Sequence, residues 1–256
     1  MTDVQLGEIV ISNFRSIKGT VHVPLDAKVV LIHGENGAGK TSLLSAIEMA
    51  LTGHVLSLQR ADPNYAAQLL HRSAERGEIG LKTLGLAHHN DFQTTLVRTG
   101  SQVSQSLPTE IASYFSERCY LPQSLLGQLL QIYQEADSSL DSPLSRFVSE
   151  LLIALHMTVA GPLPWLILDD PVQSMDDVHI SHFAALLRTL SKQHNRQVIL
   201  AVHDRQLFEY LRLELSPAFS GDSLLALELL RGSNHDTLCV SERRGFREET
   251  TLQFAA

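Results

Sequence analysis

The sequence predicts an α/β protein in which helices flank a mainly parallel central sheet, with an antiparallel β-layer formed by the N-terminal part of the chain. Three largely apolar runs, at 28–33, 165–170 and 197–203, have the composition of strands buried on both faces. An amphipathic stretch follows the second run and a helical segment follows the third, and this alternation is typical of a parallel sheet. Shorter runs bounded by turn residues predict the antiparallel layer, at 8–14, 20–25, 79–87 and 92–98.

The remaining elements complete one predicted domain. A β-pair at 224–230 and 237–242 is expected to close the sheet. A polar stretch rich in helix breakers at 135–143 is expected to be a loop. Helical segments are expected from Lys40 onward and at 108–118, 124–133, 178–193 and 205–213.

Composition limits the class of protein. A chain of 256 residues with 44% apolar side chains can bury one sizeable core or two small ones. The net charge of −8 argues against a surface that coats DNA, although a local basic patch is compatible with it. Cys119 and Cys239 lie far apart in apolar surroundings, which argues against a disulfide framework. With no apolar run of 18 residues and no signal peptide, we expect a cytoplasmic protein with no membrane contact.

Residues 34–41 read Gly-Glu-Asn-Gly-Ala-Gly-Lys-Thr and match the phosphate-binding pattern GxxxxGK[ST] between an apolar run and a helix. Glycines let the backbone N–H groups turn inward, and the helix adds its positive N-terminus. Lys40 is expected to reach the β- and γ-phosphates and Thr41 to join the Mg²⁺ shell. A chance glycine-rich turn is the competing interpretation, and the flanking strand and helix count against it. The sequence therefore predicts a P-loop NTPase that binds a nucleoside triphosphate through Asn36, Gly37, Ala38, Gly39, Lys40, Thr41 and Ser42.

The second half of the chain supplies matching acidic residues. Asp169 and Asp170 end a buried strand, so Asp169 is expected to hold Mg²⁺ and Asp170 to orient or deprotonate the attacking water. His203 ends the next strand, where an imidazole could contact the γ-phosphate. The competing interpretation is structural, because strands often end in Asp and Ser174 or Asp176 could be a simple helix cap.

Taken together, these motifs resemble the ABC-type ATPase heads of the SMC/RecF/RecN/SbcC group. Residues 11–18, Ile-Ser-Asn-Phe-Arg-Ser-Ile-Lys, resemble the opening strand and turn of that group, which implies that Arg15 lies beside the nucleotide. Tyr120-Leu-Pro-Gln123 resembles the Q-loop, which implies that Gln123 is a ligand of Mg²⁺ and water. Ser174-Met-Asp176 resembles the D-loop, and His203 the switch histidine. Asp170 stands where many relatives carry Glu, but RecF-like members also use Asp-Asp.

The resemblance implies an ATP-hydrolysing, Mg²⁺-dependent head that dimerises with a second copy around ATP. It also implies coupling of hydrolysis to DNA, in DNA repair, chromosome maintenance or anti-phage defence, with a nuclease or effector subunit as a further partner. The alternative is an ATP-binding scaffold that recruits such a partner without efficient turnover. A transporter subunit is disfavoured, because the opening motif and the Asp-Asp-Pro strand differ and no membrane-coupling segment is seen.

The chain departs from the group at the signature motif. Leu144-Ser145-Arg-Phe lacks the glycine of that motif, and the stretch between Gln123 and Asp169 is too short for a coiled coil. We therefore expect one head domain, 1–256, assembled from an N-terminal lobe (1–150) and a C-terminal lobe (154–256), with the coiled coil absent near 150–154. The same sequence would result from a designed deletion, from omitted residues or from a natural short variant.

Overall fold

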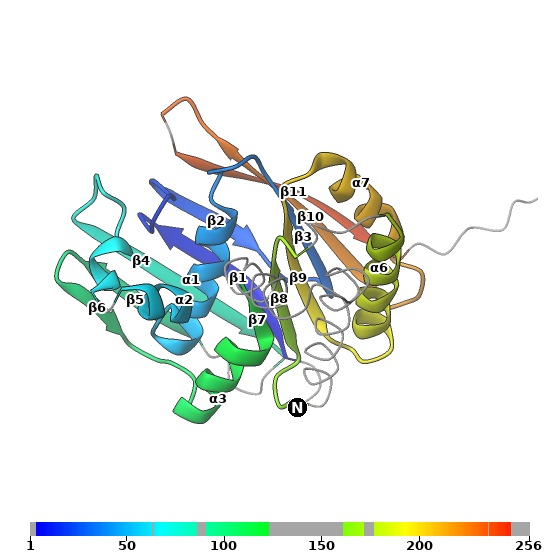
Figure 1. Ribbon diagram of the computed structural model, residues 1–256, viewed down its shortest axis with the longest axis horizontal. Helices are drawn as coiled ribbons and strands as arrows, with labels where there is room; N and C mark the ends of the chain where they lie inside the picture. Colours follow the sequence, from blue (N-terminus) through cyan, green and yellow to red (C-terminus); the bar gives the residue numbers. More distant parts are fainter. Residues whose placement is uncertain are drawn as a thin grey trace, which may run out of the picture.

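The computed structural model describes residues 4–62, 64–85, 91–122, 161–171, 177–234 and 236–246. In this part of the chain a five-stranded sheet with the order β2-β1-β4-β5-β6 lies beside a six-stranded sheet with the order β11-β10-β3-β9-β8-β7. Helix α1 lies between the two sheets, and helices α6 and α7 cover the outer face of the six-stranded sheet (Figure 1). The predicted α/β class is confirmed.

The five-stranded sheet is antiparallel throughout. On β4, buried and exposed residues alternate, as expected when one face of a sheet is solvated and the other packs against a core. The predicted antiparallel layer is confirmed, and its last, short strand was not predicted. The strands are β1 (Gln5–Ser12), β2 (Thr20–Pro24), β4 (Arg76–Leu84), β5 (Asp91–Val97) and β6 (Gly100–Val103).

The six-stranded sheet is mainly parallel. All its neighbouring pairs are parallel except the β10–β11 hairpin, which is the closing β-pair that the sequence predicted. In register, Asp169 lies beside Ala201, and His33 beside Val202. The carboxyl ends of three strands therefore meet at one edge. The strands are β3 (Val29–His33), β7 (Tyr120–Leu121), β8 (Trp165–Asp169), β9 (Gln197–Val202), β10 (Ser223–Arg231) and β11 (Thr237–Gly245).

The helices agree with the sequence pattern apart from short segments. The predicted helical stretch 108–118 is a short α-helix continued by a π-helical turn, and the six-residue helix after α1 was not predicted. The helix expected at 124–133 and the loop expected at 135–143 lie outside the described residues. None of the described helices is long and apolar enough to cross a membrane. The helices are α1 (Lys40–Thr52), α2 (Leu56–Ala61), η1 (Tyr65–Gln68), α3 (Thr109–Tyr114), η2 (Phe115–Cys119), α6 (Asp177–Lys192) and α7 (Arg205–Glu214).

Strand β3 divides the apolar core in two. Its residues Val30 and Ile32 pack toward α1 and the antiparallel sheet, while Val29 and Leu31 pack toward α6 and α7. All but one of the α1 side chains are buried. The helix that begins at the glycine-rich loop is therefore fixed between the two sheets.

A buried glutamine connects the sheets. The Gln197 side chain accepts a hydrogen bond from Leu6 N–H (2.7 Å) and donates to the carbonyls of Leu6, Leu25 and Ala27. These contacts link the start of β9 to β1 and to the chain leading into β3. Since buried backbone groups must be paired, this side chain fixes the relative placement of the two sheets.

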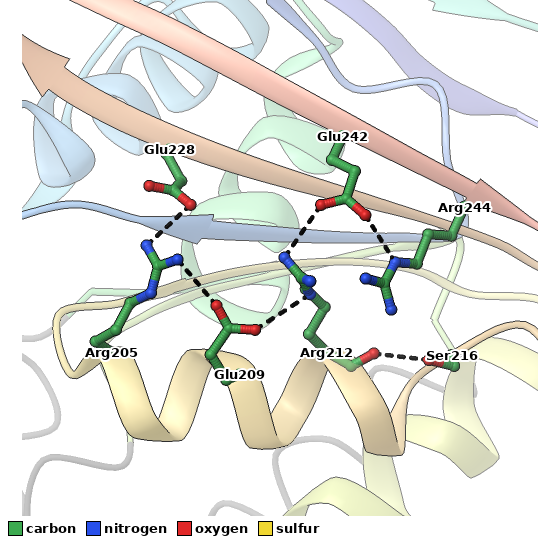
Figure 2. Close-up of polar contacts among 7 residues, drawn as sticks. All are labelled: Arg205, Glu209, Arg212, Ser216, Glu228, Glu242 and Arg244. Atoms are coloured by element: carbon green, nitrogen blue, oxygen red, sulfur yellow. Dashed lines mark hydrogen bonds and ion pairs between the residues drawn. The ribbon is translucent and has the colours of Figure 1, made fainter.

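Ion pairs join α7 to the β10–β11 hairpin (Figure 2). Arg205 contacts Glu228 on β10 (2.9 Å), and Arg212 contacts Glu242 on β11 (3.1 Å). Glu209 lies between the two arginines, 3.0 Å from one and 3.3 Å from the other. Single surface ion pairs stabilise a protein by little, but a connected set restrains the orientation of the groups that it joins.

Candidate functional site

A cavity of about 350 Å³ opens at the edge where β3 and β8 end. It brings together residues from both halves of the chain, including Lys40 and Asp169, as the sequence led us to expect. The lining residues are Arg15, Ser16, Asn36, Gly37, Gly39, Lys40, Thr41, Ser42, Asp169 and Asp170.

The glycine-rich loop forms one wall of this cavity. Gly37 (φ 81°) and Gly39 (φ 111°) both have left-handed backbone conformations, which glycine adopts without a steric penalty. Gly39 is also the residue from which α1 begins. The first-turn N–H groups of a helix lack intrahelical acceptors and carry partial positive charge. The loop and helix together therefore form an anion-binding wall.

Lys40 lies within the curve of this loop. Its Nζ donates to the carbonyl oxygens of Gly34 (2.6 Å) and Glu35 (3.1 Å). Burial lowers the pKa of Lys40, and the nearby carboxylates Asp170 and Asp169 act against that shift. The ammonium group thus lies between the loop backbone and the acidic pair.

The acidic pair forms the opposite wall. Asp169 is almost fully buried, and burial raises its pKa; a hydrogen bond from Thr41 lowers it, and the charge of Asp170 raises it. Asp169 Oδ2 and Asp170 Oδ1 have no hydrogen-bond partner within the described part of the chain. Asp170 Oδ2 lies 2.6 Å from Nδ1 of His203.

The donor set fits a magnesium ion. Buried carboxylate oxygens without partners are costly unless a cation offsets them. Mg²⁺ prefers oxygen ligands and usually takes one or two carboxylates, with water and phosphate completing its shell. Thr41 and Asp169, which share a hydrogen bond, could hold it here.

The turn in the predicted opening motif, at Arg15 and Ser16, packs against helix α1. Arg15 Nη1 donates to Ser45 Oγ (2.9 Å), and burial lowers the pKa of this guanidinium. The hydroxyls of Ser16 and Ser42 lie 2.8 Å apart. Arg15 has φ of 51°, and its backbone N–H donates to Leu69 O (2.8 Å). The turn that contains Arg15 and Ser16 is therefore held by α1 through its side chains and by the Leu69 carbonyl through its backbone.

The structure brings together nearly all the described residues that the sequence selected. Ala38 is buried in the loop, does not line the cavity, and donates its N–H to Glu35 O (3.0 Å). His203 reaches the cavity through Asp170. Gln123, Ser145 and the 174–176 segment lie outside the described residues, so their roles stay predictions.

Two residues of the site were missed from sequence. Ser16 lies within the opening motif, and its neighbour Arg15 was the signal that could have found it. Arg231, at the end of β10, donates to Gly37 O of the glycine-rich loop. It belongs to no motif, so its position follows only from the sheet order.

A second cavity, of about 700 Å³, adjoins the first and shares Arg15 and Ser16 with it. Burial and the neighbouring charges of Arg72, Lys18 and Arg98 all lower the pKa of His71 in its wall. Among the described residues that line this cleft there is no carboxylate and there are several cationic side chains, so the described lining is electropositive. Its lining is Arg15, Ser16, Lys18, Ala67, Gln68, Leu70, His71, Arg72, Ser73, Arg98 and Arg231.

Comparison with known sequences gives a family match and a related protein of known name. A family model described as an AAA domain matches residues 8–115, which include the glycine-rich loop. A Staphylococcus saprophyticus protein named for hemin import and ATP binding, HrtA, is 22% identical over 192 residues, or 72% of this chain and 80% of that protein.

Many solved structures share the fold, and three SMC heads are among them. The SMC head domain from Thermotoga maritima superposes with a TM-score of 0.59 at 17% identity, over 93% of this chain and 99% of that one. An Smc head bound to the C-winged helix domain of ScpA gives 0.58 at 12%, over 93% and 97%. An Smc head with an extended coiled coil, bound to the C-terminal domain of ScpA from Pyrococcus furiosus, gives 0.61 at 10%, over 94% and 96%.

Proposed function

We propose that this chain, which has the fold of an ABC-type ATPase head of the SMC group, binds ATP with Mg²⁺ and hydrolyses it. One observation carries the proposal. Lys40 and Thr41 at the start of a buried helix, and Asp169 at the end of a buried strand, line the same cavity. A magnesium-bound triphosphate requires backbone amides and a lysine for its phosphates. It also requires a hydroxyl and a carboxylate for the metal ion.

Each residue has a defined part in this proposal. The loop amides and Lys40 hold the β- and γ-phosphates, while Thr41 and Asp169 hold Mg²⁺, which neutralises charge on the phosphate oxygens. Asp170 orients and deprotonates the attacking water, and His203 fixes the Asp170 carboxylate. Gln123 completes the set in the part of the chain beyond the described residues.

The adjoining electropositive cleft provides room for the rest of the nucleotide. It adjoins the triphosphate cavity, and Arg15 and Ser16 line both. Arg15 lies at the junction, where it would contact the phosphate nearest the sugar. The cleft would then hold the ribose and the base.

At a larger scale, we propose one head formed by lobes 1–150 and 154–256, which dimerises with a second copy around ATP and acts on DNA in repair, chromosome maintenance or anti-phage defence. The similarity in fold to SMC heads supports this proposal. Two of those heads are bound to a domain of ScpA, which supports a partner subunit here as well. Leu144-Ser145-Arg-Phe lacks the glycine of the signature motif, which favours the alternative of an ATP-binding scaffold without efficient turnover.

Nucleotide binding is tested with Lys40→Ala. Isothermal titration with MgATP should show binding by the wild-type chain and none by the variant, because the variant loses the cation that faces the phosphates. Lys82→Ala is the matched control, since Lys82 is an exposed lysine paired with Glu8 on the antiparallel sheet. Wild-type affinity in Lys40→Ala, with an unchanged thermal midpoint, would refute the proposed site.

Turnover and assembly need separate measurements. If the scaffold alternative holds, the chain binds ATP but releases no phosphate above the rate of the Lys40→Ala variant. If the chain dimerises around ATP, its mass measured by light scattering should increase when ATP is added.

If the chain binds DNA through phosphate contacts, its affinity for DNA should fall steeply as the salt concentration rises.

A further inference from the structure

The side chain of Arg231 reaches from the end of β10 to the tip of the phosphate loop. Its Nε and Nη2 both donate to the carbonyl oxygen of Gly37, at 3.2 and 2.9 Å. Two donors of one planar guanidinium converge on one acceptor, which fixes the direction of that carbonyl more tightly than a single donor would.

The loop also rests on the backbone of the same hairpin. A Cβ placed on Gly34 would lie 2.8 Å from Leu229 O, so β10 packs directly beneath the loop. A Cβ on Gly39 would lie 3.8 Å from the Thr237 methyl on β11. Lys18, which follows the opening motif, donates to Asn234 O in the hairpin turn (2.9 Å). The hairpin thus contacts the phosphate loop from below and at its side.

The carbonyl that Arg231 holds belongs to Gly37, a residue whose own conformation does not fix its direction. Gly37 has a positive φ and no side chain, so its backbone has wide conformational freedom. The peptide between Gly37 and Ala38 is anchored at both ends: its carbonyl accepts from Arg231, and its N–H donates to Glu35 O (3.0 Å). Removal of the guanidinium would release one of these anchors.

Arg231 projects from a braced strand. Glu228, three residues before it on β10, is paired with Arg205 at the start of α7, as Figure 2 shows. Arg212 on the same helix holds β11 through Glu242. The middle of the hairpin is therefore fixed to α7, the helix that follows His203, so the arginine acts from a rigid support.

We propose that Arg231 is a positioning residue for nucleotide binding, which holds the Gly37–Ala38 peptide so that the loop is shaped for phosphate before the ligand arrives. The inference rests on the proposed function, because it concerns the same triphosphate site. Arg231 acts through the loop backbone by its geometry. Its positive charge alone does not provide this effect.

Arg231→Ala should raise the Kd for MgATP about tenfold, which corresponds to about 1.4 kcal/mol. The defect should persist at high salt, because it arises from loop geometry rather than from long-range attraction. Arg231→Lys should restore only part of the affinity, since lysine keeps the charge but has no planar fork. The thermal midpoint of the nucleotide-free chain should stay close to that of wild type.

Arg243→Ala is the matched control. Arg243 lies on β11 of the same hairpin and donates to Asp26 O (2.8 Å), away from the phosphate loop. It should bind MgATP as wild type does. Equal affinity of Arg231→Ala and wild type, or full recovery in Arg231→Lys, would overturn the positioning role. The Lys40→Ala variant separates the two proposals. If both Lys40→Ala and Arg231→Ala bind MgATP normally, the proposed function fails. If Lys40→Ala loses binding while Arg231→Ala does not, only the role of Arg231 fails.

Discussion

His203 Nδ1 lies 2.6 Å from Oδ2 of Asp170, at the carboxyl ends of two adjacent strands. The contact follows from the sheet, because β8 and β9 run parallel and Asp170 N–H donates to Ala201 O (3.0 Å). Asp170 has φ of 50°, a conformation rare for a residue other than glycine, asparagine or aspartate. Its second oxygen, Oδ1, has no partner within the described residues and belongs to a side chain that lines the cavity. The histidine thus holds one carboxylate oxygen while the other is available for a ligand.

Asp170→Asn should bind MgATP but turn it over at least about 100-fold more slowly in any form of the protein that hydrolyses ATP. Asparagine keeps the shape of the side chain and its contact with His203, but its amide cannot accept a proton from water. Single-turnover phosphate release and a parallel titration would measure the two effects.

Asp204→Asn provides the matched control for this change. Asp204 follows His203 directly and caps α7 by accepting a hydrogen bond from Leu207 N–H (2.7 Å). Asparagine caps helices about as well as aspartate, so both binding and turnover should be retained. Normal turnover in Asp170→Asn would remove Asp170 from the role of base.

Glu48 makes the stability of the fold depend on pH. It is buried on α1, and burial raises its pKa from 4.5 to about 7 against the opposing hydrogen bonds from Ser116 and Leu56 N–H and the charge of Arg60. The folded state therefore binds the proton more tightly than the unfolded state does. Stability from this group is full below pH 4.5 and is lost as the pH rises through about 7.

Glu48→Gln should remove this loss, because glutamine mimics the protonated side chain. At pH 8 the variant should be more stable than wild type by up to about 3 kcal/mol, and near pH 4.5 the two should be equal. Urea unfolding of both proteins between pH 4.5 and pH 8 measures the difference in their free energy of unfolding. Groups common to both proteins, such as Asp169, contribute equally and cancel in this difference. Glu117→Gln, an exposed change on the same segment as Ser116, is the control and should match wild type at every pH. A constant offset between Glu48→Gln and wild type would contradict the assignment.

The larger elements of the fold could be predicted because their signals are local. The apolar runs that became β3, β8 and β9 are buried on both faces, and no polar side chain interrupts their centres. The short strands β6 and β7 could not be predicted, since Gly100–Val103 and Tyr120–Leu121 are defined by the strands beside them. Likewise, the role of Gln197 depends on two sheets meeting at one side chain, which no sequence pattern records.

The same distinction applies to the site. Lys40, Thr41 and Asp169 could be selected because phosphate and Mg²⁺ chemistry demands those residue types at the start of a helix and the end of a strand. Arg231 could not be found in this way. It contacts backbone, its partner is a glycine far away in sequence, and arginine at a strand end is ordinarily a solvated residue.

Gln197→Leu should destabilise the chain by about 3–5 kcal/mol. The substitution removes the side-chain hydrogen bonds to Leu6 N–H and to three backbone carbonyls at the junction of the sheets, of which Leu25 O still accepts from Ala27 N–H. Urea or thermal unfolding would measure the loss. Gln193→Ala, an exposed change at the end of α6, is the control and should have little effect. A loss below about 1 kcal/mol, the contribution of a single hydrogen bond, would show that the junction is held mainly by apolar packing.

Gly34→Ala should weaken MgATP binding by moving the phosphate loop off its support. The added methyl carbon would lie 2.8 Å from Leu229 O and 3.1 Å from the Ala38 side chain, and neither neighbour is the free end of a flexible side chain. Gly34 does not have a positive φ, so the cost comes from space alone, about 1–3 kcal/mol for an overpacked position. Displacement of this residue also moves the carbonyl that Lys40 binds, so affinity and thermal midpoint should fall together. Gly80→Ala is the control, because a Cβ there meets nothing within 4 Å and no positive φ opposes it. If Gly34→Ala binds MgATP as tightly as Gly80→Ala does, the loop does not depend on its contact with β10.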